Sequence, residues 1–238
     1  MTKERKIKYA QLSIAASWSC PEDTFVKNEN AFFETDTTFF EIITFGYNTV
    51  IRADKRILDW CIENFANTPA SEIVDGENLF NIEKKLRDYG KKLAGEHLNF
   101  LHLHPEINAK KPNGFTYELY EKDRIPELYL DNRFDNALGD DSDKTELAII
   151  ARKEGDIAAI AAVDSHHHGL WQMGIDTVDI HRGKGLATYL IKELAIESEK
   201  RNQVPFYATW SANIASMRTT LSAGFSPVWV KYFAEDMQ

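Results

Sequence analysis

The stretch WQMGIDTVDIHRGKGLA, residues 171–187, has the pattern of a strand, a glycine turn and the start of a helix. The strand pattern ends at about residue 177. The helix pattern begins at Leu186, and its apolar positions are Leu186, Ala187, Leu190, Ile191, Leu194 and Ala195. This stretch therefore predicts a strand, a turn and a helix in immediate succession.

The turn has the composition of an anion site. Gly183 and Gly185 allow backbone angles that other residues avoid, and the first N–H groups of the following helix have no intrahelical acceptor. Such free amides commonly bind phosphate, and Arg182 and Lys184 add positive charge. A turn that only packs the helix against a sheet remains the alternative.

Two common phosphate-binding motifs are excluded by spacing. A dinucleotide fingerprint requires a third glycine three residues after Gly185, where this chain has Thr188. The chain also has no G-x-x-x-x-G-K-[ST] run. A dinucleotide or P-loop site is therefore not expected.

The spacing resembles a different family. Arg182-x-x-Gly185-x-Ala187 resembles the [QR]-x-x-G-x-[GA] signature of the GCN5-related N-acetyltransferase (GNAT) superfamily. The pattern N-x-x-[AS]-(x7)-G-F of that family is matched one helix and one strand later, by Asn213, Ser216, Gly224 and Phe225. With both motifs in this order the chain resembles a two-lobed member of the superfamily, with the GNAT core in its C-terminal half, over residues 115–233.

The resemblance implies an α/β (α+β) fold with a mixed, mostly antiparallel sheet flanked by helices. The two expected domains are a smaller α/β N-terminal unit over residues 1–110 and a GNAT domain over residues 115–238. The boundary is placed at residues 104–114, which contain two prolines and a glycine. The N-terminal unit is either a degenerate second GNAT lobe or a separate cap, and the sequence leaves both open.

Periodicity predicts further elements on both sides of this boundary. In the N-terminal half, helices are expected at 8–18, from an N-cap at Asp54 to 65, and at 77–94, with strands at 39–45, 47–52 and 99–104. In the C-terminal half, strands are expected at 115–120, 146–152, 157–163, 205–210 and 227–233, with one or two short helices at 125–134. The histidines of SHHHG, residues 165–169, are expected in an exposed turn.

Acetyl-CoA is the co-substrate that the resemblance implies. The residues implied to bind it are Ile175, Thr177, Arg182, Gly183, Lys184, Gly185, Leu186, Ala187, Asn213 and Ser216. In the family the strand before the turn diverges from its neighbour, which leaves an amide near Thr177 for the thioester carbonyl. A helix N-cap is an alternative role for Asn213.

The acid and base of the reaction are less defined. Asp176 and Glu118 are the candidates for a general base, each with a structural or solvated carboxylate as the alternative. The family often has a tyrosine seven residues after the asparagine, as acid for the thiolate, and here Thr220, a poorer acid, occupies that position. Trp171 and Trp210 are candidates for the acceptor pocket or for the core. No metal site is expected, including at His102 and His104.

Composition bounds the function. A net charge of -9 disfavours nucleic acid as a partner, and no apolar run approaches the ~18 residues of a membrane span. Cys20 and Cys61 are expected to be buried free thiols in a cytoplasmic protein. The predicted function is N-acetyl transfer from acetyl-CoA to a primary amine of a small molecule. The alternative is a non-catalytic acyl-CoA sensor, and a homodimer is left open.

Overall fold

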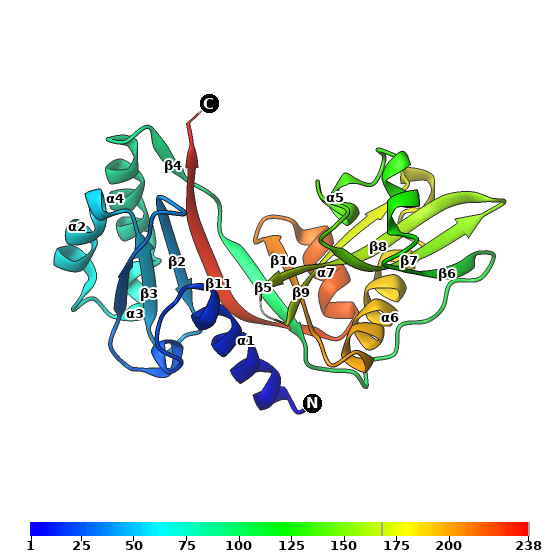
Figure 1. Ribbon diagram of the computed structural model, residues 1–238, viewed down its shortest axis with the longest axis horizontal. Helices are drawn as coiled ribbons and strands as arrows, with labels where there is room; N and C mark the ends of the chain where they lie inside the picture. The colour runs from blue at the N-terminus through cyan, green and yellow to red at the C-terminus, as the bar shows by residue number, and fades with distance from the viewer. Residues whose placement is uncertain (168, 238) are drawn as a thin grey trace. The chain divides into compact units, whose positions relative to one another are not determined.

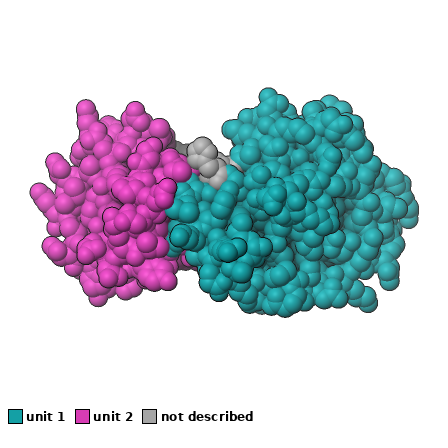
Figure 2. All heavy atoms as spheres, turned by 60° about the horizontal axis from the view of Figure 1, so that its bottom comes forward, with its two compact units in different colours: residues 1–14, 100–209, 213–227 teal, residues 15–99, 210–212, 228–238 magenta. Residues whose placement is uncertain are grey.

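The chain forms two compact units, coloured separately in Figure 2. The computed structural model describes residues 1–167 and 169–237. Unit 1 comprises residues 1–14, 100–209 and 213–227, and unit 2 comprises residues 15–99, 210–212 and 228–238. The chain therefore passes between the units several times.

Unit 1 is built on a sheet with the strand order β6-β7-β8-β9-β10-β5. The pairs β6–β7, β7–β8 and β8–β9 are antiparallel, and β10 pairs with β9 in parallel. The bounds are β5 His97–His102, β6 Thr116–Glu121, β7 Thr145–Lys153, β8 Asp156–His167, β9 Leu170–Thr177 and β10 Val204–Trp210. The mixed, mostly antiparallel sheet is the one that the resemblance implies.

Helices cover both faces of this sheet, as Figure 1 shows. The 3-10 helix η2 (Ile125–Leu130) and the helix α5 (Asp135–Leu138) lie on one face, where they bury Phe134, Ile150 and Ile160. The other helices of the unit are η3 (Asp179–His181), α6 (Leu186–Lys200) and α7 (Ile214–Ser222). Apolar residues of α6 at helical spacing, including Leu190 and Leu194, are fully buried, as the sequence predicts.

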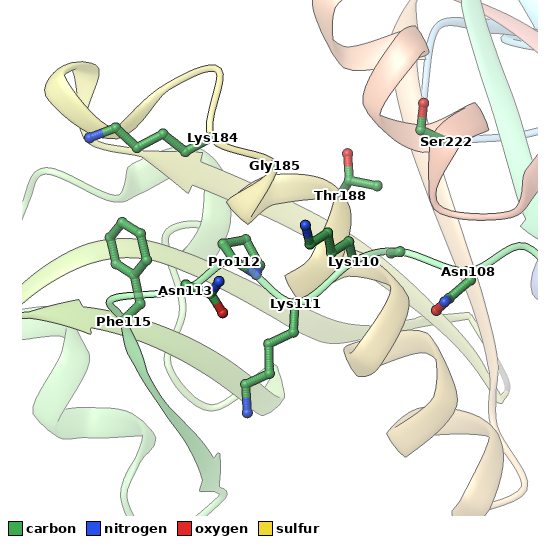
Figure 3. Close-up of a pocket in the computed structure, with 11 residues that line it drawn as sticks. Asn108, Lys110, Lys111, Pro112, Asn113, Phe115, Lys184, Gly185, Thr188 and Ser222 are labelled. Atoms are coloured by element: carbon green, nitrogen blue, oxygen red, sulfur yellow. The ribbon is translucent and has the colours of Figure 1, made fainter.

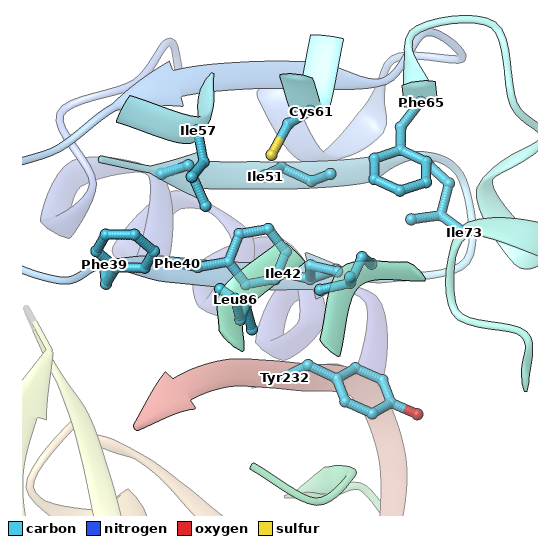
Figure 4. Packing of buried hydrophobic residues seen from close by; sticks show 12 residues of the cluster. Phe39, Phe40, Ile42, Ile51, Ile57, Cys61, Phe65, Ile73, Leu86 and Tyr232 are labelled. Carbon is cyan, nitrogen blue, oxygen red and sulfur yellow. The ribbon is translucent and has the colours of Figure 1, made fainter. Parts of the chain in front are cut away.

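Unit 2 is a smaller α/β body. Its strand order is β1-β3-β2-β11, with β4 paired to β11, and its strand bounds are β1 Ala31–Glu34, β2 Phe40–Thr44, β3 Thr49–Ala53, β4 Lys91–Leu93 and β11 Phe225–Asp236. Its helices are η1 (Thr24–Val26), α2 (Lys55–Phe65), α3 (Ala70–Ile73) and α4 (Gly76–Arg87). Figure 4 shows Ile57, Cys61 and Phe65 of α2 in its core.

The two units do not coincide with the expected halves of the chain. The helix α1 (Lys3–Ser17) begins in unit 1, and β11 begins in unit 1 and ends in unit 2. Residues 104–114 lie inside unit 1, although their prolines and glycine suggested a boundary. Strand pairing between distant segments, such as β2 with β11, determines the units, and local composition does not report such pairing.

One predicted helix is too long. The apolar spacing continues to residue 94, but α4 ends at Arg87, and residues 91–93 form β4. Gly90 adopts a φ of 70°, which ends the helical path, and β4 then pairs with residues 234–236 of β11. The hydrogen bonds of a partner far along the chain therefore override the local periodicity.

Both cysteines are buried and free, as predicted. Burial raises the pKa of the Cys61 thiol to about 12 and also raises the pKa of Cys20. Neither thiol is therefore ionised at neutral pH. Within the described ranges, no helix is both long and apolar enough to cross a membrane.

Candidate functional site

The glycine turn lies between β9 and α6, where the sequence predicts it. Gly183 and Gly185 have φ values of 73° and 81°, which are left-handed conformations that favour glycine. Gly185 is the N-cap residue of α6. Because glycine has no side chain, this residue cannot cap the amides of the first turn. The two glycines are therefore required by the backbone path of the turn.

Six consecutive amides at this turn have no hydrogen-bond acceptor among the described residues. The first helical hydrogen bond of α6 runs from the N–H of Tyr189 to the carbonyl of Gly185. The N–H groups of residues 183–188 find no backbone acceptor outside α6 among the described residues, and the first three helical positions cannot find one within it. A run of free amides at the positive end of a 15-residue helix favours an anion.

The strand before the turn diverges from its neighbour. Parallel pairing of β9 with β10 covers only residues 170–173 and 204–207, so residues 174–177 of β9 pair with β8 alone. The hydroxyl oxygen of Thr177 is buried and has no partner among the described residues. An unpaired strand edge and an orphaned buried hydroxyl thus lie directly before the free amides, and they fit a ligand that pairs like an added strand.

The two cations of the turn already have partners. The Nε of Arg182 donates to the carbonyl of Thr177 at 3.3 Å, and Arg182 also pairs with Asp179 at 3.0 Å. Lys184 donates to the carbonyl of Ile180 at 2.9 Å. Desolvation and the charge of Lys184 lower the pKa of His181, so that imidazole is neutral at pH 7. The two cations therefore stabilise the conformation of the turn and also add positive charge to it.

A pocket of 520 Å³ opens at the first turn of α6 (Figure 3). One wall is formed by Lys184, Gly185 and Thr188, and the facing wall is formed by residues 108–113 and Phe115. We call residues 108–115 the strap. Sequence reasoning assigned most of the strap to a domain boundary, because prolines and glycines mark linkers and pocket walls alike.

The second motif takes up its predicted place in α7. The side chain of Asn213 caps α7 by accepting a hydrogen bond from the N–H of Ser216 at 3.1 Å, which confirms the N-cap alternative. The hydroxyl of Thr220 donates to the carbonyl of Ser216 and is buried. The hydroxyl of Ser216 lies 2.7 Å from that of Tyr207. Sequence reasoning missed Tyr207, which no motif singles out.

Asp176 is held by the backbone of a neighbouring helix. One carboxylate oxygen accepts from the N–H of Ala137 at 2.9 Å, and the other accepts from the side-chain amide of Asn136 at 3.1 Å. Gly174, two residues earlier on β9, lets this helix approach, because a Cβ there would lie 2.3 Å from the carbonyl oxygen of Asn136. These contacts favour a structural role for the Asp176 carboxylate.

We therefore expect Asp176→Asn to affect stability more than catalysis. The substitution removes the charge and one acceptor for the N-terminal end of α5, so the free energy of unfolding should fall by roughly 1–2 kcal/mol. Turnover should fall far less than the ~10²- to 10⁴-fold that the loss of a general base costs. Denaturant unfolding and the pH profile of the rate measure the two effects. A large loss of turnover at unchanged stability would identify Asp176 as the base.

Glu118 lies exposed on β6. It accepts a hydrogen bond from Arg124 at 2.8 Å and lies 3.9 Å from Arg152. The hydrogen bond from Arg124 lowers the pKa of Glu118 below its ordinary value, which makes the carboxylate a weaker base. The ion pair is the role that the geometry supports for this candidate.

The histidines and tryptophans take up other positions. His102 is buried and bonds through Nδ1 to Glu199, to which Lys6 also donates, and no group of three or more possible metal ligands occurs among the described residues. In the SHHHG segment β8 extends through His167, so the turn begins later than expected, and His168 lies outside the described residues. Trp171 on β9 is in register with Pro205 of β10, and the pairing of the two strands ends at Tyr207, before Trp210.

The comparisons with known proteins rest on structure. No protein-family model and no curated protein matches the chain. A GCN5-related N-acetyltransferase-like protein from Streptococcus suis superposes with a TM-score of 0.50 at 16% identity, over 68% of this chain and 69% of that one. A GNAT-family protein from Novosphingobium aromaticivorans gives a TM-score of 0.45 at 19% identity, over 63% and 69%. A Salmonella typhimurium protein solved with acetyl-CoA gives 0.37 at 15% identity, over 53% and 95%.

Proposed function

Because this chain has the fold of the GCN5-related N-acetyltransferases, we propose that it transfers the acetyl group of acetyl-CoA to a primary amine of a small molecule. The observation that carries the proposal is the succession of two sets of free groups, the unpaired edge of residues 174–177 at the end of β9 and the amides of residues 183–188 at the first turn of α6. A thioester with a long polar arm and a pyrophosphate requires such groups in that order. The acidic composition and the two reduced thiols support a cytoplasmic location.

The residues present fit this coenzyme. The amides of residues 183–188 would hold its pyrophosphate, and the unpaired edge of residues 174–177 would hold its pantetheine arm. Bound acetyl-CoA supplies an activated acyl group, so no covalent intermediate on the protein is required. The side chains at the site would orient the acceptor amine and the thioester for direct attack.

A proton is available from Tyr207. Burial raises the pKa of its phenol above the ordinary value, so the phenol is protonated at neutral pH. Its oxygen lies 2.7 Å from that of Ser216, at the position where β9 and β10 stop pairing. We propose that Tyr207 and Ser216 supply the proton that Thr220 does not, because the hydroxyl of Thr220 is donated to a backbone carbonyl.

The second candidate is an acyl-CoA sensor that binds the coenzyme without transfer. It is favoured by the engaged hydroxyl of Thr220 and by the engaged carboxylates of Asp176 and Glu118. Incubation of the protein with acetyl-CoA and a panel of small amines, with detection of released thiol, separates the two functions. An enzyme releases CoA with at least one amine faster than with buffer alone. A sensor binds CoA and releases nothing above background.

A further inference from the structure

We propose that the strap makes the site selective for the 3′-phosphate of coenzyme A, through Lys110. The inference rests on the proposed function, since it concerns the same coenzyme. Lys110 lies outside both sequence motifs, and the 3′-phosphate is separate from the pyrophosphate. The strap, residues 108–115, immediately precedes β6 and forms the wall of the pocket that faces α6.

The strap is held against the body of unit 1 by specific contacts. The phenol of Tyr117 on β6 donates to the carbonyl of Pro112 at 2.8 Å. Just before the strap, the buried ammonium of Lys192 on α6 donates to the carbonyl of Ile107. Pro112 lies 4.0 Å from where a Cβ of Gly185 would stand. The strap is therefore a fixed wall beside the free amides.

The two lysines of the strap have different surroundings. The ammonium of Lys111 lies over the ring of Tyr117, 4.8 Å from its centroid, so it already has a partner. Lys110 is exposed and makes no ion pair, hydrogen bond or cation–π contact with the described residues. Figure 3 shows Lys110 of the strap and Thr188 of the first turn of α6 lining the same pocket. Lys110 is thus an uncommitted cation at the rim of the pocket.

The ligand chemistry follows from this placement. The free amides of α6 would bind the pyrophosphate. Lys110 lies on the strap, on the pocket wall that faces the first turn of α6. Coenzyme A carries a second, separate phosphate monoester, with a charge near −2 at neutral pH. A monoester accepts hydrogen bonds from a lysine ammonium, which acts as a point charge, and none of the described residues that line the pocket is acidic. The pocket therefore fits a phosphorylated nucleotide end better than one without the monoester.

The test is calorimetric titration of CoA and of 3′-dephospho-CoA into the wild type, Lys110→Ala and Lys110→Arg. The wild type should bind CoA roughly tenfold more tightly than dephospho-CoA, and the preference should shrink as salt is raised. Lys110→Ala should weaken CoA binding by about five- to tenfold and leave dephospho-CoA binding unchanged. Lys110→Arg should restore the preference.

Lys144→Ala is the control for the loss of one exposed positive charge, and the Lys144 ammonium lies 3.4 Å from the carboxylate of Asp141. Lys144 directly precedes the first residue of β7. The strap adjoins the other end of β7, because Thr116, which follows the strap, pairs with Arg152. Equal binding of both ligands to the wild type, or an equal loss of both in Lys110→Ala, overturns the inference and leaves the proposed function standing. If neither ligand binds, the proposed function fails and the inference fails with it.

Discussion

Gly185→Trp should lose acetyl-CoA affinity by at least about 100-fold, which corresponds to roughly 2.7 kcal/mol. Gly185 opens toward the pocket, and the nearest atom to a Cβ there is the Pro112 Cγ, at 4.0 Å. An indole at this position would therefore extend between the free amides and the strap, where the phosphates are proposed to bind. Calorimetric titration of the wild type and the variant measures the loss.

A control separates this blockage from backbone strain. Gly155, in the turn between β7 and β8, has a φ of 92°, and no atom lies within 4 Å of the place that a Cβ would take there. Gly155→Trp should impose a similar conformational cost and leave coenzyme affinity unchanged. Equal affinity of Gly185→Trp and the wild type, with both folded, would contradict a phosphate site at this turn.

Gly224→Ala should lower the free energy of unfolding by about 3 kcal/mol, because a left-handed backbone and a close backbone contact both oppose the added methyl group. Gly224 has a φ of 93°, and a Cβ there would lie 2.4 Å from the carbonyl oxygen of His104. The N–H groups of Leu103 and His104 both donate to the carbonyl of Gly224, so the two segments cannot separate without breaking these hydrogen bonds. Urea unfolding measures the change.

Gly155→Ala is again the control, since it adds the same methyl group at a nearly identical φ but in open space. It should cost only the ~1–2 kcal/mol of a left-handed non-glycine residue. Similar losses in the two variants would show that the contact with His104 is relieved by a small shift. The comparison also gives a physical reason for the glycine in the second motif.

Local sequence was sufficient where short-range physics determines the structure. The strand, turn and helix of residues 171–187 are confirmed, because glycine at positive φ and apolar spacing act within a few residues. The caps at Asp54 and Asn213 are confirmed for the same reason, since each side chain bonds an N–H two or three residues ahead. The GNAT fold was predictable from motifs in this part of the chain.

Long-range contacts were not predictable in this way. The unit boundaries depend on β11 pairing with β2 and β4, which are distant in sequence. The position of Lys110 depends on the hydrogen bonds that Tyr117 and Lys192 make to the strap and to Ile107 just before it. The hydrogen-bond partner of Tyr207, Ser216, is on another element. Asp176 appeared available as a base because its partners on α5 lie about 40 residues away. Spacing along the chain carries no information on such neighbours.

The central claim is that residues 174–188 bind an acyl-CoA, and titration of acetyl-CoA into the wild-type chain tests it most directly. We predict saturable binding at one site per chain with a dissociation constant of about 1–100 μM. Absence of binding at millimolar acetyl-CoA would contradict the transferase and the sensor together. The glycine turn would then serve only to pack α6 against the sheet.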